Sequence, residues 1–180
     1  PHYLRDEHLL RRFYLEAKAA SKLDHPNIVK IYDFGIDEDL KIPFIAMEYL
    51  TGDDLGDLIS NKGPFSETDA CELLSQVAKA LVEAHDKGIV HRDLKPANLF
   101  LTHIIGQGET VEVLDVGIAK VTGDMAPDTR LTREGTAIGS PRFMAPEQAR
   151  AQEVKPATDV YAMGCILYLM LTGRPVFKGT

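Results

Sequence analysis

Apolar residues recur along this chain with helical spacing in some stretches and strand-like spacing in others, and this outlines the predicted elements. The first helical stretch holds apolar residues near the N-terminus: Leu9, Phe13, Ala20 and Leu23. Residues three, four or seven apart share one face of a helix, so this spacing predicts an amphipathic helix. Pro26 ends the helix because proline cannot continue it. Glu16 falls on the same face, as a carboxylate among apolar positions.

A longer helix is predicted between residues 66 and 88. Ser66 and Asp69 have the spacing of a helix N-terminal cap. Apolar residues with a period near 3.6 follow it: Ala70, Leu73, Leu74, Val77, Leu81 and Ala84. Gly88 supplies the stop. His85 lies on the apolar face, and we expect it to pack at the helix end rather than to bind a ligand.

Four short apolar runs have the length of β-strands. They cover residues 28–34, 43–49, 99–101 and 111–114. The last two runs bracket a polar insertion, which predicts a hairpin with residues 98 and 115 at the same end. A final apolar run at residues 160–171 is too short to span a bilayer and predicts a core helix buried all round. We expect Asp159 to be its N-terminal cap and Gly173 to end it.

The composition is that of an ordinary globular domain of 180 residues, 44% hydrophobic and 26% charged. This length is enough for one sizeable core. The net charge of −7 argues against nucleic acid or an anionic membrane surface as the main partner. Cys71 and Cys165 fall within helical apolar patterns, which predicts buried free thiols and a cytoplasmic location. A parent protein could still be anchored in a membrane outside this segment.

The densest group of functional side chains is the loop His91–Phe100. It places a carboxylate (Asp93), an ammonium group (Lys95) and a carboxamide (Asn98) within six residues. Such residues in a proline-containing loop are most often turn chemistry. A second carboxylate, Asp115, follows the apolar run of the predicted hairpin and favours a functional interpretation. Together these groups could position a hydroxyl, a phosphate and a metal ion.

The pattern His-Arg-Asp-x-Lys-x-x-Asn followed by Asp-x-Gly resembles the catalytic and magnesium-binding loops of protein kinases. Lys95, two residues after the Asp, has the form seen in serine/threonine kinases, and the bacterial members are the most similar overall. Two further segments resemble the family in the family's order. One is Phe13-x-x-Glu16 followed by His25–Val29, and the other is Gly139–Glu147.

The resemblance implies catalytic roles for Asp93, Lys95 and Asn98. Asp93 would accept the proton of a protein Ser or Thr hydroxyl, and Lys95 would neutralise the γ-phosphoryl group. Asn98 and Asp115 would hold magnesium, because both offer the hard oxygen donors that this ion prefers. ATP and Mg²⁺ are therefore the expected cofactors, and proteins with Ser or Thr are the expected substrates. The histidine of the motif, His91, is expected to be structural. The resemblance also implies that Asp159, in Asp159-Val160-Tyr161-x-x-Gly164, holds the backbone of this loop in place.

The adenine site rests wholly on the resemblance. After the second strand-like run the sequence turns to Thr-Gly-Asp-Asp, which is typical of a linker. The resemblance implies that the carbonyl of Glu48 and the amide of Leu50 contact the base. It also places Phe100 under the adenine ring, Asp54 near the ribose and Met47 at the back of the site.

Four residues are expected to regulate the site. Glu16 would be the helix carboxylate that pairs with a lysine of the small lobe. Arg92 adjoins the catalytic Asp, as in kinases that are switched on by phosphorylation of a long polar loop. A phosphate on Thr136, or with less support on Thr132, would pair with Arg92 and order that loop.

The resemblance implies an α+β, protein-kinase-like fold. We expect a partial N-lobe at residues 1–48 (helix C and two strands) and a hinge at 49–54. A mainly helical C-lobe at 55–180 would run through helix F and lack its last helices. The chain has neither a glycine-rich phosphate loop nor a Val-Ala-x-Lys strand ahead of Glu16, so we expect a fragment that is inactive by itself. Val116 replaces the usual Phe. This would lower the stabilisation from packing between the lobes by roughly 1 to 3 kcal/mol if no other side chain fills the space.

Two other functions are weighed against a serine/threonine protein kinase. A non-catalytic kinase-like scaffold or nucleotide-binding pseudokinase is favoured by Val116 and by the missing lysine. It is opposed by the intact set Asp93, Lys95, Asn98 and Asp115. A small-molecule phosphotransferase of related fold is opposed by Gly139–Glu147, because that segment resembles a peptide-docking surface. The resemblance also allows a kinase dimer.

Overall fold

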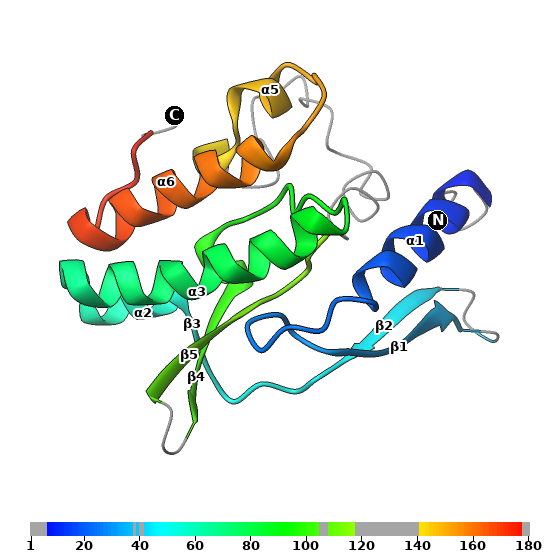
Figure 1. Ribbon diagram of the computed structural model, residues 1–180, viewed down its shortest axis with the longest axis horizontal. Coiled ribbons are helices and arrows are strands. Elements are labelled where there is room, and N and C mark those ends of the chain that lie inside the picture. Colours follow the sequence, from blue (N-terminus) through cyan, green and yellow to red (C-terminus); the bar gives the residue numbers. More distant parts are fainter. Residues whose placement is uncertain (1–6, 38, 40–41, 105–107, 118–140, 178–180) are drawn as a thin grey trace.

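A computed structural model describes residues 7–37, 39, 42–104, 108–117 and 141–177 of the chain (Figure 1). The helices are α1 (Glu7–Ala20), α2 (Leu55–Lys62), α3 (Glu67–Asp86), α5 (Pro146–Ala149) and α6 (Pro156–Thr172), with short 3₁₀ turns η2 (Pro96–Asn98) and η3 (Pro141–Phe143). The strands are β1 (Ile31–Ile36), β2 (Pro43–Met47), β3 (Gly52–Asp54), β4 (Leu99–Ile104) and β5 (Gly108–Val113). Figure 1 shows a small group of α1, β1 and β2 beside a larger group that holds the other elements.

The strands form two separate antiparallel sheets. β1 pairs with β2 in one sheet, and β3, β4 and β5 lie in that order in the other. β5 also pairs with the segment that precedes β1. The Val29 N–H donates to the Val113 carbonyl at 3.2 Å, and the Val113 N–H donates to the Asn27 carbonyl at 2.9 Å. The two groups are therefore joined through β5 as well as through the chain.

β3 approaches β4 so closely that it requires glycine. A Cβ atom at Gly52 would lie 2.0 Å from the carbonyl oxygen of Leu101. No side chain fits at that distance, so this pairing depends on Gly52. The pairing sets Asp54 opposite Phe100 and so brings the end of the linker to the larger sheet.

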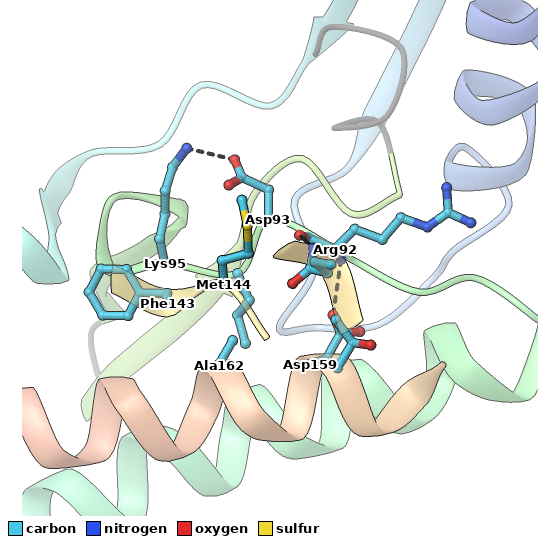
Figure 2. A pocket seen from close by; sticks show the side chains of 10 residues that line it. Arg92, Asp93, Lys95, Phe143, Met144, Asp159 and Ala162 are labelled. Carbon is cyan, nitrogen blue, oxygen red and sulfur yellow. Dashed lines mark hydrogen bonds and ion pairs between the residues drawn. The ribbon is translucent and has the colours of Figure 1, made fainter. Parts of the chain in front are cut away.

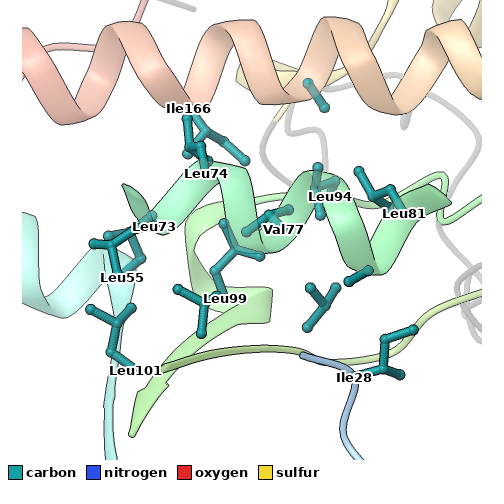
Figure 3. Packing of buried hydrophobic residues seen from close by; sticks show 14 of the residues in the cluster. Ile28, Leu55, Leu73, Leu74, Val77, Leu81, Leu94, Leu99, Leu101 and Ile166 are labelled. Atoms are coloured by element: carbon teal, nitrogen blue, oxygen red, sulfur yellow. The ribbon is translucent and has the colours of Figure 1, made fainter. Parts of the chain in front are cut away.

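The main hydrophobic core lies on both sides of α3 (Figure 3). The buried face of α3 consists of the predicted apolar residues and one further alanine: Ala70, Leu73, Leu74, Val77, Ala80, Leu81 and Ala84. Figure 3 shows Ile166 of α6 above this helix, with Leu99 and Leu101 of β4 on the other side. The core thus joins α6, α3 and the larger sheet into layers that support the polar loop after α3.

The structure confirms the predicted long helix and hairpin. The Ser66 Oγ accepts the Asp69 N–H at 3.1 Å and donates to the Asp69 carboxylate at 2.7 Å, which caps α3. Gly88 follows the helix with a φ of 74°. The β4–β5 hairpin pairs Leu99 with Val113 as expected, and it extends further than predicted, to Ile104.

The prediction that Asp159 caps the last helix is wrong. α6 begins earlier, at Pro156, with Lys155 at the cap position. Proline is favoured at the first helical position because its missing N–H would have no partner there. Asp159 therefore lies in the first turn of α6, and its carboxylate is directed to the polar loop.

Several strand boundaries and one cysteine also differ from expectation: β2 ends at Met47 rather than at residue 49, and β5 begins at Gly108 rather than at residue 111. β1 begins at Ile31 rather than at residue 28, because the residues before it pair with β5. The predicted linker 49–54 contains β3 in its second half. Cys165 is buried as predicted, whereas Cys71 is exposed because it lies on the outer face of α3.

The α6 helix is buried on one side only, against the expectation that it is buried all round. Ala162, Ile166 and Met170 are buried, whereas Val160 is 62% exposed and Tyr168 is 47% exposed. Among the described residues, α3 packs along one side of this helix, and η3, α5 and the polar loop contact its first half. None of the described helices combines the length and the hydrophobicity needed to cross a membrane.

Candidate functional site

Asp159 fixes the backbone of the polar loop (Figure 2). Its Oδ2 accepts the His91 N–H and its Oδ1 accepts the Arg92 N–H, each at 2.9 Å. The Nε2 of His85, near the end of α3, lies 2.8 Å from the same Oδ2. Asp159 is 1% exposed, so these groups replace the water that a carboxylate would otherwise bind. Arg92 has a φ of 72°, a strained conformation for a residue with a side chain.

The three predicted catalytic side chains lie together. The Lys95 Nζ donates to Asp93 Oδ2 at 2.6 Å. The Asn98 Nδ2 donates to the Asp93 carbonyl at 2.8 Å and lies 3.5 Å from Asp93 Oδ2. The η2 turn lies between Lys95 and Asn98, and the Asn98 N–H donates to the Lys95 carbonyl at 2.9 Å, so both side chains lie near Asp93. Asp93 is 48% exposed and Lys95 is 31% exposed, so the pair is open to an incoming substrate.

The backbone joins Asn98 to Asp115, the second predicted metal ligand. The Leu114 N–H donates to the Asn98 carbonyl at 2.9 Å, and Asp115 follows with a φ of 55°. Because Asn98 Nδ2 donates to Asp93, its Oδ1 faces away as an acceptor. An amide oxygen and a carboxylate fit Mg²⁺, which takes few protein oxygens and completes its shell with water and phosphate. In the described part of the chain, no group of three or more His, Cys, Asp or Glu side chains could hold a metal.

His91 is fully buried, and its neutral form satisfies both ring nitrogens. The Nε2 lies 2.9 Å from the Leu114 carbonyl, and the Asp93 N–H is directed at Nδ1 at 3.4 Å. A carbonyl only accepts and an N–H only donates, so the proton belongs on Nε2. Burial lowers the pKa of His91 from its ordinary value of 6.5, although the charge of Asp159 opposes this shift.

We expect the free energy of unfolding to fall as the pH drops below the ordinary histidine pKa of 6.5. In that range the unfolded chain binds a proton at His91 while the folded chain does not, so acid favours unfolding. The slope is at most about 1.4 kcal/mol per pH unit. Urea unfolding at about pH 7.5 and about pH 5.5 tests this. The His91→Gln variant should lose less stability between the two conditions than the wild type, and an equal loss would contradict the assignment.

Of the residues predicted to contact adenine, Glu48 and Leu50 lie between β2 and β3, and Phe100 lies on β4. The Glu48 N–H donates to the Lys30 carbonyl at 2.8 Å directly after β2, and Leu50 is half-buried just beyond it. Phe100 pairs across the strands with Glu112 of β5, which sequence analysis did not identify. Burial, followed by the charge of Glu48, raises the pKa of Glu112. A second carboxylate therefore lies close to the predicted adenine contacts.

Asp54 has a structural role that the sequence analysis missed. Its Oδ1 accepts the N–H groups of Gly56 and Asp57, at 2.8 and 3.0 Å, and so caps α2. This bond orients the carboxylate beside Phe100, its partner across β3 and β4. The predicted ribose contact and the helix cap would therefore share one side chain.

The predicted regulatory residues fall in three places. Glu16 is half-buried on α1. Arg92 directs its guanidinium away from Asp159 (Figure 2), and its buried Nε has no hydrogen-bond partner among the described residues. Thr132 and Thr136 lie outside the described residues. The structure therefore places Arg92 in the polar loop and describes neither threonine.

Val116 borders a small cavity between the two groups of elements. Ala20, Ile31 and Met47 line the same cavity, which has a volume of about 10 Å³. This is at or below the space that one water needs.

The sequence analysis missed one contact to the loop and one contact to Asp159, which holds the loop. The Gln148 Nε2 of α5 donates to the Arg92 carbonyl at 2.6 Å. His85 was expected only to pack, and it instead binds Asp159. The partners in these contacts are 56 and 74 residues apart. No local pattern predicts such pairs, because the fold alone brings them together.

The chain matches known proteins over nearly all of its length. The family profile described as "Protein kinase domain" matches residues 3–180. The serine/threonine-protein kinase pkn3 of Myxococcus xanthus is 45% identical over 97% of this chain and 32% of its own length. The serine/threonine-protein kinase PrkC of Bacillus subtilis is 40% identical over 98% of this chain and 26% of its own length. The chain thus spans a third or less of these curated relatives.

A solved structure agrees with these matches. The crystal structure of the Mycobacterium tuberculosis PknI kinase domain, as its C20A mutant, superposes with a TM-score of 0.75 at 27% sequence identity. The match covers 99% of this chain and 63% of that one. The predicted α+β, protein-kinase-like fold is confirmed. On the family profile, the relatives and the shared fold, this chain belongs to the protein kinase domain family.

Proposed function

We propose that this chain is part of the catalytic domain of a serine/threonine protein kinase that transfers the γ-phosphoryl group of ATP to protein hydroxyls. The convergence of Asp93, Lys95 and Asn98 supports this proposal, with contacts of 2.6 and 2.8 Å within one loop. The curated relatives carry the name serine/threonine-protein kinase. We propose lobes at residues 1–48 and 55–180, with a hinge at 49–54.

The roles of the residues follow from their positions. Asp93 would accept a hydrogen bond from the substrate hydroxyl and take its proton as the oxygen attacks phosphorus. Lys95, held on the same carboxylate, would bring a positive charge to the phosphoryl group as negative charge develops on it. Asn98 steadies the backbone of Asp93, which keeps the carboxylate in place. Most of the rate enhancement would come from this positioning and charge stabilisation.

The proposed cofactors are ATP and Mg²⁺. Asn98 and Asp115 would hold the ion, which when bound neutralises phosphate charge. Glu48 and Leu50 would bind the base through their backbone, and Phe100 would lie under the ring. The Asp54 carboxylate lies across from Phe100 and is proposed to reach the ribose.

A transfer assay on the full-length protein tests the proposed activity. Incubation with γ-labelled ATP, Mg²⁺ and a protein acceptor should label the acceptor. Acid hydrolysis should then yield phosphoserine or phosphothreonine. Nucleotide binding without any transfer would contradict the kinase proposal and support a pseudokinase or scaffold.

The proposed activating event is phosphorylation of Thr136, or with less support Thr132. The buried Nε of Arg92, with no hydrogen-bond partner among the described residues, supports the view that its guanidinium binds a further group. Phosphopeptides mapped in the same reaction should carry phosphate between residues 129 and 140. Active protein without phosphate in that segment would remove the proposal. Glu16 is proposed to pair with a lysine of the small lobe.

The proposed setting is cytoplasmic, and the proposed partners are protein substrates that present Ser or Thr. Cys71 is an exposed free thiol and Cys165 a buried one, which is typical of a reducing compartment. The net charge of −7 supports protein rather than nucleic acid as the partner. Formation of a kinase dimer stays a prediction.

A further inference from the structure

Side chains from elsewhere in the chain bind both the N–H and the carbonyl of Arg92. Asp159 of α6 accepts its N–H at 2.9 Å. Gln148 of α5 donates to its carbonyl at 2.6 Å. Arg92 has a φ of 72°, and a residue with a side chain keeps such a conformation only where its surroundings hold it. Asp93 is the next residue, so this conformation sets where the catalytic carboxylate points.

The orientation of the Gln148 amide is fixed by its partners. Its Oε1 accepts the Ala145 N–H at 3.0 Å, and its Nε2 donates to the Arg92 carbonyl. An N–H only donates and a carbonyl only accepts, so the reverse orientation would lose both bonds. One side chain therefore caps the start of α5 and also holds the catalytic loop.

The short α5 helix is itself anchored to the core. The Thr158 Oγ1 of α6 donates to the Glu147 carboxylate at 2.7 Å. α6 packs on α3, so the helix that carries Gln148 is anchored to the hydrophobic core through α6. Both side chains that hold Arg92 are thus supported by the same helix, since Asp159 is part of α6 and Glu147 is bonded to it.

Gln148 also lies where the catalytic loop meets the segment before α5. A cavity of about 30 Å³ lies between them and is lined by Asp93, Lys95, Phe143, Met144 and Gln148. Figure 2 shows Phe143 and Met144 beside Lys95 and Asp93. The Gln148 bond to Arg92 is therefore a polar tie between this segment and the loop that carries the catalytic carboxylate.

We propose that Gln148 is a positioning residue for phosphoryl transfer. By donating to the Arg92 carbonyl, it stabilises the strained backbone that aims Asp93 at the substrate hydroxyl. Its effect is on the chemical step, because it touches neither the proposed nucleotide contacts nor the metal ligands. This inference rests on the proposed kinase function.

Two substitutions separate this role from simple capping of α5. Gln148→Glu keeps an oxygen for the Ala145 N–H but has no donor for the Arg92 carbonyl. Gln148→Met loses both bonds at a similar side-chain size. The matched control is Gln152→Glu, which makes the same charge change at an exposed glutamine four residues along the chain.

The experiment measures kcat, the KM for ATP and amide hydrogen exchange in the full-length protein and these variants. Both Gln148 variants should lower kcat by about tenfold, which corresponds to about 1.4 kcal/mol, with the KM for ATP unchanged. The peptide that contains Arg92 and Asp93 should exchange faster in both variants. Gln152→Glu should match the wild type in every measurement.

Two outcomes would overturn the inference. If Gln148→Glu keeps the wild-type kcat and exchange while Gln148→Met does not, Gln148 only caps α5. If both variants exchange the Arg92 peptide at the wild-type rate, the bond does not hold the loop. The exchange measurement needs no activity, so it decides the role of Gln148 even if the wild type transfers no phosphate and the proposed function fails.

Discussion

Asp93→Asn should lower kcat for phosphoryl transfer by about 10²- to 10⁴-fold, the usual contribution of a positioned acid–base group. The carboxamide has nearly the same size but cannot take the hydroxyl proton. It would also lose the charge that pairs with Lys95 at 2.6 Å. Nucleotide affinity should change little, because the proposed adenine and metal contacts are made by other residues. Steady-state kinetics and ATP binding by calorimetry would separate the two effects.

Asp86→Asn is the matched control for this substitution. Asp86 is the exposed last residue of α3 and lies outside the catalytic loop. It should retain wild-type kcat and ATP affinity. Turnover that survives in Asp93→Asn would mean that Asp93 is not the group that receives the proton, and the proposed mechanism would have to be abandoned.

Asp159→Ala should lower the free energy of unfolding by about 3 to 5 kcal/mol, the range expected when one partner of a buried charged network is removed. The His91 and Arg92 N–H groups would lose their acceptor in a site where Asp159 is 1% exposed. His85 would lose its partner as well. Urea denaturation gives the loss directly. Activity should disappear together with the strained conformation at Arg92.

A solvent-exposed aspartate, Asp24, provides the control for the unfolding measurement on Asp159→Ala. Asp24 is exposed in the turn after α1, and Asp24→Ala should change stability by no more than about 0.5 kcal/mol. A loss below about 1 kcal/mol for Asp159→Ala would show that water replaces its carboxylate at little cost. The three hydrogen bonds would then not be what holds the polar loop in place.

Features with a local cause could be predicted from the sequence. The Ser66 cap, the apolar face of α3 and the stop at Gly88 follow from residues within a few positions of one another. The hairpin followed from two apolar runs around a polar insertion. The loop around Asp93 could be recognised because its polar residues lie within six positions. Each of these features could be predicted because the residues that cause it are close together in the sequence.

Features with a distant cause could not be predicted from local chemistry. An aspartate before an apolar run is typical of a helix cap, and this led to the wrong cap prediction for Asp159. Only the resemblance to kinases implied its contact with the backbone of the polar loop, which the structure confirms. Its actual partner, the His91 N–H, is 68 residues away. The Gln148 contact and the exposed side of α6 have the same origin, since packing of whole elements decides both. Val116 is 4% exposed and belongs to the main core, beside a cavity of about 10 Å³.

The attachment of residues 27–29 to β5 determines how the two groups of elements can move. Leu23 and Ile28 belong to the main core, whereas Phe13 and Ala17 pack in a separate small cluster. The Asn27 side chain is also bound to Gln76 and to the Val111 carbonyl, so this stretch travels with the larger group.

A rocking motion of β1 and β2 would therefore pivot where the chain leaves this attachment and where it returns after β2. The C-terminal end of α1 lies beside the pivot, so the N-terminal end of the helix would undergo the larger displacement. Glu16 lies about one helical turn before Ala20, the last residue of α1. Its carboxylate would therefore be displaced less than the first residues of the helix.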